Sequence, residues 1–185
     1  MKHKFTLDDD EPLFEEWSFL LFRSSEPAYS FADTLNRLYD YRLARVDDMM
    51  LDGVAWPLFQ HHDPVRHLLF FLAEQPPTAV GTPWAARDKL LIVRGETADN
   101  IVGAIHLDFT APPPFDQADL LAREHAALLD SLLADFTVAL PLDFATQPTT
   151  SKAAKERALA EQYCNAILTH IETRRLDLSP EERIL

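Results

Sequence analysis

The sequence predicts an α+β protein: a mostly antiparallel sheet of about six or seven strands carries helices and is followed by a long C-terminal helix. Two observations support this. Short apolar runs bounded by turn residues recur along the chain, and several longer segments place apolar residues at helical spacing. The predicted organisation is an acidic arm (1–16), an α+β domain (17–146) and a C-terminal helical extension (147–185).

The first two elements follow the acidic arm. "WSFLLFR" (17–23) is apolar on both alternating faces, as in a central strand covered on both sides. Periodicity alone does not separate this from a buried helix segment, but its length and aromatic content favour a strand. The next segment predicts an amphipathic helix with Ser24 or Ser25 as its N-cap and Pro27 in its first turn. Its apolar stripe consists of Ala28, Phe31, Leu35, Leu38 and Tyr39.

The middle of the chain is typical of strands and tight turns. "YRLARVD" (41–47) predicts a short strand, and Asp52-Gly53 marks a turn before a strand that contains Pro57, which indicates an edge or a bulge. "HHDPVR" (61–66) predicts a turn that returns the chain as a hairpin into 67–74. In the Pro-rich surface loop 75–86, we expect Trp84 to anchor the loop onto the core rather than to make an exposed contact.

Residues 89–109 admit two interpretations. We predict a hairpin of 89–94 with 101–109, which would put His106 and Asp108 on one strand face. The alternative is a helix through "TADNIVGAIH", which would place Gly103 in a helix interior at a cost of about 1 kcal/mol relative to alanine.

The C-terminal half of the chain predicts a helix, a strand and a second helix. Leu121, His125, Leu128, Leu132 and Phe136 share one helical stripe, with Asp116 as the cap, and 136–144 alternates as a last strand.

A long helix is then expected to begin near Ser151. Its first half has no apolar stripe and is expected to project into solvent or onto a partner. Its second half has a stripe formed by Ala160, Tyr163, Cys164, Ile167, Leu168 and Ile171. We expect Tyr163, Ile167, Leu168 and Ile171 to bind a protein partner or a second copy of the chain.

Composition argues against several classes of function. The formal net charge of −13 disfavours non-specific nucleic-acid binding. The four glycines form neither a P-loop nor a dinucleotide-binding fingerprint. A single cysteine precludes an intramolecular disulfide, no apolar run approaches the length of a membrane span, and no signal-peptide pattern is seen. We therefore expect a cytoplasmic protein with no membrane partner.

The segments "YRLARVDD" and "WPLFQHHDPVRHLLFFLAE", in this order of elements, resemble the IPExxxDY family of small bacterial proteins, mainly from Bacteroidetes. The resemblance covers about residues 17–144. The nearest match to the signature is "TPWAARDK", which keeps Pro83 and Asp88; aligning the predicted hairpin instead keeps only Asp99. The family implies no reaction, substrate or cofactor, so no catalytic residue is carried over.

Histidines are the best candidates for chemistry. His61, His62 and His67, with His106 and Asp108, are residue types that bind zinc or iron, although their spacing is not that of a known site. Adjacent residues of a strand point to opposite faces, so at most one of His61 and His62 could join His67.

The remaining candidates favour structural roles. Cys164 is expected to be a small buried hydrophobe, and Asp47-Asp48 a turn. Arg87, Lys89 and Arg94 are interpreted as ion-pairing surface charges. Our first hypothesis is a non-enzymatic interaction or regulatory protein with no cofactor. The alternative is a small metal-dependent enzyme that uses His106, Asp108 and a turn histidine.

Overall fold

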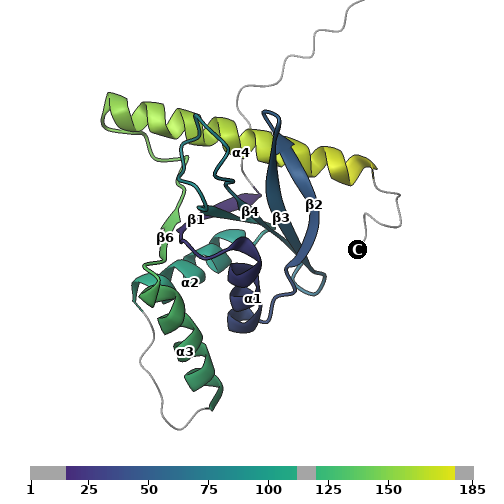
Figure 1. Cartoon of the computed structure of the whole chain (residues 1–185), viewed down its shortest axis with the longest axis vertical. Coiled ribbons are helices and arrows are strands. Elements are labelled where there is room, and N and C mark those ends of the chain that lie inside the picture. Colours follow the sequence, from purple (N-terminus) through teal and green to yellow (C-terminus); the bar gives the residue numbers. More distant parts are fainter. Residues whose placement is uncertain (1–15, 112–119, 178–185) are drawn as a thin grey trace, which may run out of the picture.

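The structure, a computed structural model, describes residues 16–111 and 120–177. This part of the chain forms an α+β fold with one antiparallel sheet in the order β2-β3-β4-β5-β1-β6 (Figure 1). The strands are Trp17–Arg23 (β1), Ala44–Leu51 (β2), Val54–Asp63 (β3), Leu68–Glu74 (β4), Lys89–Arg94 (β5) and Val138–Pro141 (β6). The helices are Ala28–Tyr39 (α1), Ala98–Thr110 (α2), Leu120–Ala134 (α3) and Ser151–Asp177 (α4). The predicted fold class is confirmed, while the predicted acidic arm falls outside the described residues except for Glu16.

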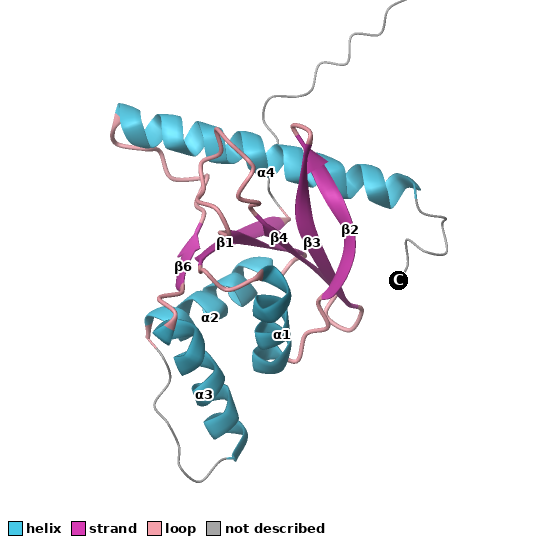
Figure 2. Ribbon diagram, viewed as in Figure 1, coloured by secondary structure: helices cyan, strands magenta, loops and turns pink. Residues whose placement is uncertain are grey.

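The sheet is covered on both faces, because its strands alternate between two apolar layers (Figure 2). In β1, Leu20 and Phe22 face the layer that contains α1, α2 and α3. Phe19 and Leu21 face the layer that contains α4. β1 pairs with β5 on one side and β6 on the other, so the prediction of a central strand covered on both faces is confirmed.

Helix α1 has the expected apolar stripe, but its N-terminus differs from the prediction. Pro27 occupies the N-cap position, and no side chain caps the helix. The predicted caps, Ser24 and Ser25, precede it, and the Ser25 hydroxyl instead donates to Asp135 at 2.9 Å. Proline costs nothing there because the first amide groups of a helix lack an intrahelical partner anyway.

Strand β2 extends through Asp47 and Asp48, so the prediction of a turn at these residues is wrong. The pairing register between β2 and β3 shifts between Val46 and Met49. Two residues of β2 therefore lie opposite Pro57, which has no backbone N–H to donate. The bulge expected at Pro57 is confirmed, although β3 is an interior strand rather than an edge. The loop after β4 is anchored as expected, because Trp84 is buried against Trp56 and Tyr163.

The hairpin expected from 89–94 and 101–109 is wrong in its second half, because that segment belongs to helix α2. Its buried residues, Ala98, Val102, Ile105 and Phe109, recur at helical spacing and face the α1 layer. In addition, the buried Ser18 hydroxyl of β1 donates to Asp99 in the first turn of α2. Burial of this face outweighs the cost of a glycine at position 103.

Helix α3 packs through Leu129 and Leu132, whereas the two ends of its predicted stripe are exposed. Leu121 is 75% exposed, and Phe136 is 89% exposed beyond the end of the helix. The predicted cap, Asp116, lies outside the described residues. β6 follows as a short strand on β1, within the predicted range 136–144.

Helix α4 begins at Ser151 as predicted, and its apolar stripe packs on the chain's own sheet. Tyr163, Ile167, Leu168 and Ile171 are all buried in the layer that contains Trp56 and Ile92. These four side chains are therefore not exposed for a partner in this fold, contrary to the expectation from the sequence. The first half of α4 extends beyond the sheet (Figure 1).

Candidate functional site

A hollow of about 820 Å³ lies at one end of the sheet. We call it the sheet-end hollow, and it is lined by Glu16, His62, His67, Leu69, Arg94, Gly95 and Glu96. These residues come from the start of β1, the hairpin between β3 and β4, and the turn that leads from β5 to α2. Its polar lining consists of carboxylate, imidazole and guanidinium groups, which bind charged ligands through ion pairs and hydrogen bonds.

Strand register places a row of side chains across one face of the sheet at this hollow. His62 pairs with Leu69, Leu69 pairs with Arg94, and Arg94 pairs with Trp17. Directly paired residues of an antiparallel sheet point to the same face. The row therefore lies on the face that α4 covers, beside Glu172 near the C-terminal end of that helix.

The backbone around the hollow depends on two residues in the left-handed region. His67, in the turn between β3 and β4, has φ 55°, and Gly95 has φ 138°. The Gly95 N–H donates to the Glu16 carbonyl at 3.0 Å. A Cβ at position 95 would lie 2.8 Å from the His67 carbonyl oxygen, so only glycine lets the two turns approach this closely.

Arg94 connects the elements around the hollow. Its guanidinium donates to Glu16 at 3.1 Å and to Glu172 at 3.2 Å. It also lies over the Trp17 ring, 5.3 Å from the centroid. The Arg94 side chain is 28% exposed, so water partly screens these ion pairs. The start of β1 and the end of α4 are thus held by one cation, while Glu96 forms no ion pair with another described residue.

The structure brings two of the candidate histidines together and separates the third. His62 and His67 both line the sheet-end hollow. His61 points to the opposite face, where its ring stacks on Tyr41 at 5.6 Å and lies 5.3 Å from Phe70. Burial lowers the pKa of His61, and it is the main factor that raises the pKa of Tyr41 to about 12. The prediction that at most one of the adjacent pair joins His67 agrees with this geometry.

His106 and Asp108 do not form the strand-face pair that the sequence predicted, because both are in α2. Residues two apart on a helix point to different sides. Asp108 instead accepts a hydrogen bond from the Tyr39 hydroxyl at 3.0 Å and lies 3.8 Å from Nε2 of His125. Nδ1 of His125 lies 3.1 Å from the Leu38 carbonyl. Burial, and then the charge of Asp108, raises the pKa of Tyr39.

This Tyr39, Asp108 and His125 cluster joins the three helices that cover one face of the sheet. The rings of Tyr39 and His125 meet edge to face at 5.9 Å, and Tyr39 stacks on Tyr41 at 5.5 Å. The arrangement holds α3 against the end of α1. The geometry therefore favours a structural role for Asp108.

Two other features bear on the sequence-based hypotheses. A smaller hollow of about 240 Å³ is lined by Asp47, Asp48, His170, Thr173 and Arg174. Within residues 16–111 and 120–177, no three histidine, cysteine or acidic side chains are grouped as a metal ion would require. Cys164 is completely buried, and burial raises the pKa of its thiol, as expected for a cysteine that packs as a hydrophobe.

Comparison with known proteins does not assign a family. No family model, no curated protein and no solved structure matches this chain. The resemblance to the IPExxxDY family therefore stays a prediction. None of the helices among the described residues is both long and apolar enough to cross a membrane.

Sequence reasoning missed several residues of the hollow. Glu16 was assigned to the acidic arm, Arg94 to the surface charges, and Glu96 to a hairpin loop. The available signal was "VRGE" (93–96), in which a buried strand ends in two opposite charges on either side of a glycine. Glycine in such a place indicates close backbone approach. Nothing local indicates that His62 and His67 lie opposite it, because that depends on strand register.

Proposed function

We propose that this protein is a non-enzymatic interaction module and that the sheet-end hollow receives a basic segment of a partner protein. The observation that carries the proposal is the hollow itself: about 820 Å³, with Glu16 and Glu96 on its wall against one guanidinium, that of Arg94. Glu16 and Glu172 already bind that guanidinium. A lysine or arginine of a partner would therefore meet carboxylate oxygens rather than a free cation.

Long-range electrostatics favour the same partner. The formal net charge of −13 attracts a basic segment and repels an acidic one. A second copy of the chain would carry the same charge and would be repelled. We place the interaction in the cytoplasm, where the single cysteine would remain reduced.

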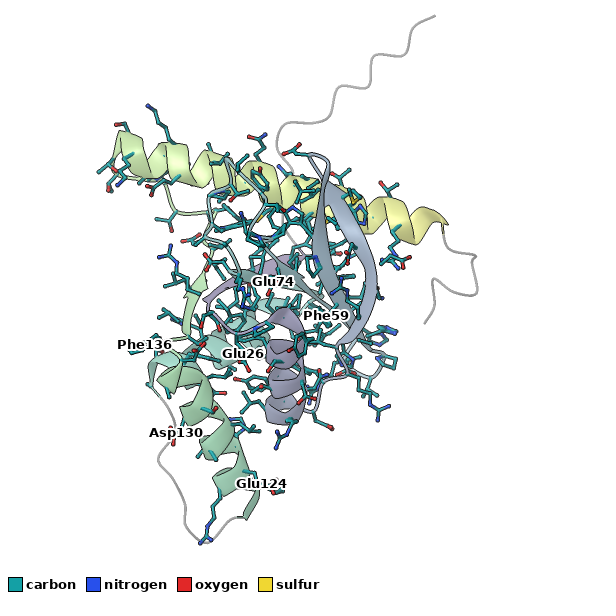
Figure 3. The ribbon with its side chains drawn as sticks, in the orientation of Figure 1. Glu26, Phe59, Glu74, Glu124, Asp130 and Phe136 are labelled. Atoms are coloured by element: carbon teal, nitrogen blue, oxygen red, sulfur yellow. The ribbon has the colours of Figure 1, made fainter. Side chains whose placement is uncertain are left out.

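Binding of a basic probe tests the proposal. The probe is a fluorescein-labelled pentapeptide, Gly-Lys-Gly-Arg-Gly, measured by anisotropy at low salt. The test variant, Glu16→Gln with Glu96→Gln, removes two charges from the hollow. The control, Glu124→Gln with Asp130→Asn, removes two exposed charges from α3, which extends away from the sheet (Figure 3). Both variants change the net charge equally, so long-range attraction is matched.

We expect the hollow variant to bind the probe about fivefold more weakly than the control, because each lost charge removes a short-range attraction that salt screens only partly. A chemical shift change at the Gly95 amide on addition of the probe would locate the contact. Equal binding by the two variants would show that the peptide responds to net charge alone, and the proposal would be wrong.

A further inference from the structure

We infer that the sheet-end hollow releases its basic partner when the solution becomes mildly acidic, because His62 and His67 share its wall with the carboxylates that bind the partner. The inference rests on the proposed function and names the regulation of the same site. Its physical basis is the position of the two imidazoles, both of which line the hollow with Glu16, Arg94 and Glu96.

The charge of the wall depends on these two histidines. With neutral imidazoles, two carboxylates and one guanidinium leave the lining with a formal charge of −1. Protonation of both imidazoles would change it to +1. Histidine is the residue type in this wall whose charge ordinarily changes between about pH 5 and 8.

The charged groups around the two imidazoles come from every element that borders the hollow. Arg66 and Asp63 are 3.8 Å apart in the turn that holds His67, so they largely compensate each other. Glu16 at the start of β1 and Glu172 of α4 both bind Arg94 at the end of β5. Glu96, in the turn after β5, forms no ion pair with another described residue. His61 is adjacent in sequence but lies on the other face of the sheet.

The turn between β3 and β4 fixes the backbone position of His67. Its left-handed conformation, φ 55°, is fixed by the turn, in which Asp63 accepts hydrogen bonds from the Val65 and Arg66 N–H groups at 3.1 and 3.0 Å. The close approach of Gly95 sets the other side of the hollow. His67 and Glu96 thus lie on two closely approaching turns, with His62 near the end of β3 and Glu16 just before β1.

The size of the effect follows from Coulomb's law. Each new positive charge about 7 Å from a bound cation weakens binding roughly threefold at a water-like dielectric constant, so two such charges weaken it about tenfold. The effect should shrink at high salt, because ionic screening acts over about 10 Å at 0.1 M.

The experiment measures the dissociation constant of the Gly-Lys-Gly-Arg-Gly probe at pH 7.5 and 5.5 with the full chain. The test variant is His62→Gln with His67→Asn; asparagine is chosen because it tolerates the left-handed backbone of position 67. The control, His106→Gln with His170→Gln, removes the same number of histidines from outside the hollow. Far-UV circular dichroism at both pH values confirms that each protein is folded.

We expect about tenfold weaker binding at pH 5.5 for the wild type and the control, and less than a twofold change for the test variant. The inference is overturned if wild-type binding is independent of pH, or if the test variant keeps the full dependence. Either result leaves the proposed function intact as long as Glu16→Gln with Glu96→Gln weakens binding at pH 7.5. If Glu16→Gln with Glu96→Gln does not weaken binding at pH 7.5, the proposed function itself is overturned.

Discussion

The two ends of strand β5 carry a positive charge in opposite ways. Lys89, the first residue, is completely buried, and its ammonium donates to the Arg87 carbonyl at 2.7 Å and the Ser24 carbonyl at 3.1 Å. Arg94, the last residue, is partly exposed and binds Glu16 and Glu172 beside an open hollow. Each cation lies over an aromatic ring, Phe31 for Lys89 and Trp17 for Arg94, 5.3 Å from each centroid.

The difference lies in what compensates the charge. Lys89 has Glu74 at 3.6 Å, slightly too far for a hydrogen bond, and that carboxylate oxygen is buried with no hydrogen-bond donor. Burial lowers the pKa of Lys89, and the charge of Glu74 opposes this shift. The pair of Lys89 and Glu74 therefore has a structural role, because removing either residue leaves the charge of the other without compensation. At the Arg94 end, the side chains are partly exposed and water screens their charges.

The largest effect is expected for Lys89→Ala. It should lower the free energy of unfolding by about 3–5 kcal/mol, because Glu74 is left as an unpaired buried charge. Arg94→Ala should cost about 1 kcal/mol, since its ion pairs are screened by solvent. Urea denaturation followed by tryptophan fluorescence compares the two. A double variant, Lys89→Met with Glu74→Leu, should recover much of the loss, and equal losses for the two single variants would contradict the comparison.

The next effect concerns the turn after Arg94. Gly95→Ala should destabilise the protein by about 2 kcal/mol, because alanine has to adopt φ 138° and its Cβ would lie 2.8 Å from the His67 carbonyl oxygen. Gly81→Ala is the control: φ is also positive there, but no atom lies within 4 Å. The urea midpoints of the two variants separate the strain of a positive φ from the close contact with the His67 carbonyl. If both variants lose the same stability, the approach of the two turns is not what requires glycine at position 95.

A smaller effect of opposite sign is expected for Gly103→Ala. Position 103 lies inside helix α2 with open space around it, so alanine should stabilise the protein by about 0.5–1 kcal/mol. The same substitution would not benefit from helix propensity if the segment after Arg94 were a strand. Thermal unfolding gives the sign directly, and a lower melting temperature would argue against α2.

The smallest expected effect is the contribution of His61 to the pH dependence of folding stability. Burial lowers the pKa of His61 in the folded protein, whereas the unfolded chain binds the proton near pH 6.5. The unfolded state therefore takes up more protons as the pH falls below about 6.5, and stability is lost. His61→Gln should reduce the loss of stability between pH 7.5 and 5.5, measured by urea titration. A loss as large as that of the wild type would mean that other groups account for it.

The sequence was informative wherever one local pattern admitted a single structure. The apolar residues of α1 recur at helical spacing, and the length and aromatic content of "WSFLLFR" favour a strand over a buried helix segment, so both elements were predicted with their correct bounds or nearly so. The turn at 52–53 was indicated by its residues, and the turn expected at 61–66 is present, although β3 extends through Asp63 and the turn covers 64–67. Trp84 was correctly predicted as an anchor because a large aromatic in a Pro-rich loop gains most by burial.

The second half of the expected hairpin failed for a physical reason. In 98–110, apolar residues occur at both helical and alternating spacing, so local pattern alone could not choose between helix and strand. Packing decided it: the side of a helix that carries Val102, Ile105 and Phe109 fits beneath β1 and β6. Because this segment is a helix, His106 and Asp108 do not share a strand face, and Asp108 contacts Tyr39 and His125 instead.

By itself, the sequence determined the α+β class, most of the strands, α1, the long C-terminal helix and the acidic character of the chain, because these depend on periodicity, turn residues and composition. Only the tertiary structure decided that the stripe of α4 packs on the chain's own sheet and that His62, His67, Arg94 and Glu96 share one hollow. Local pattern specifies which face of an element is apolar, whereas strand register and helix docking, which bring distant residues together, are set by the best burial of all faces at once.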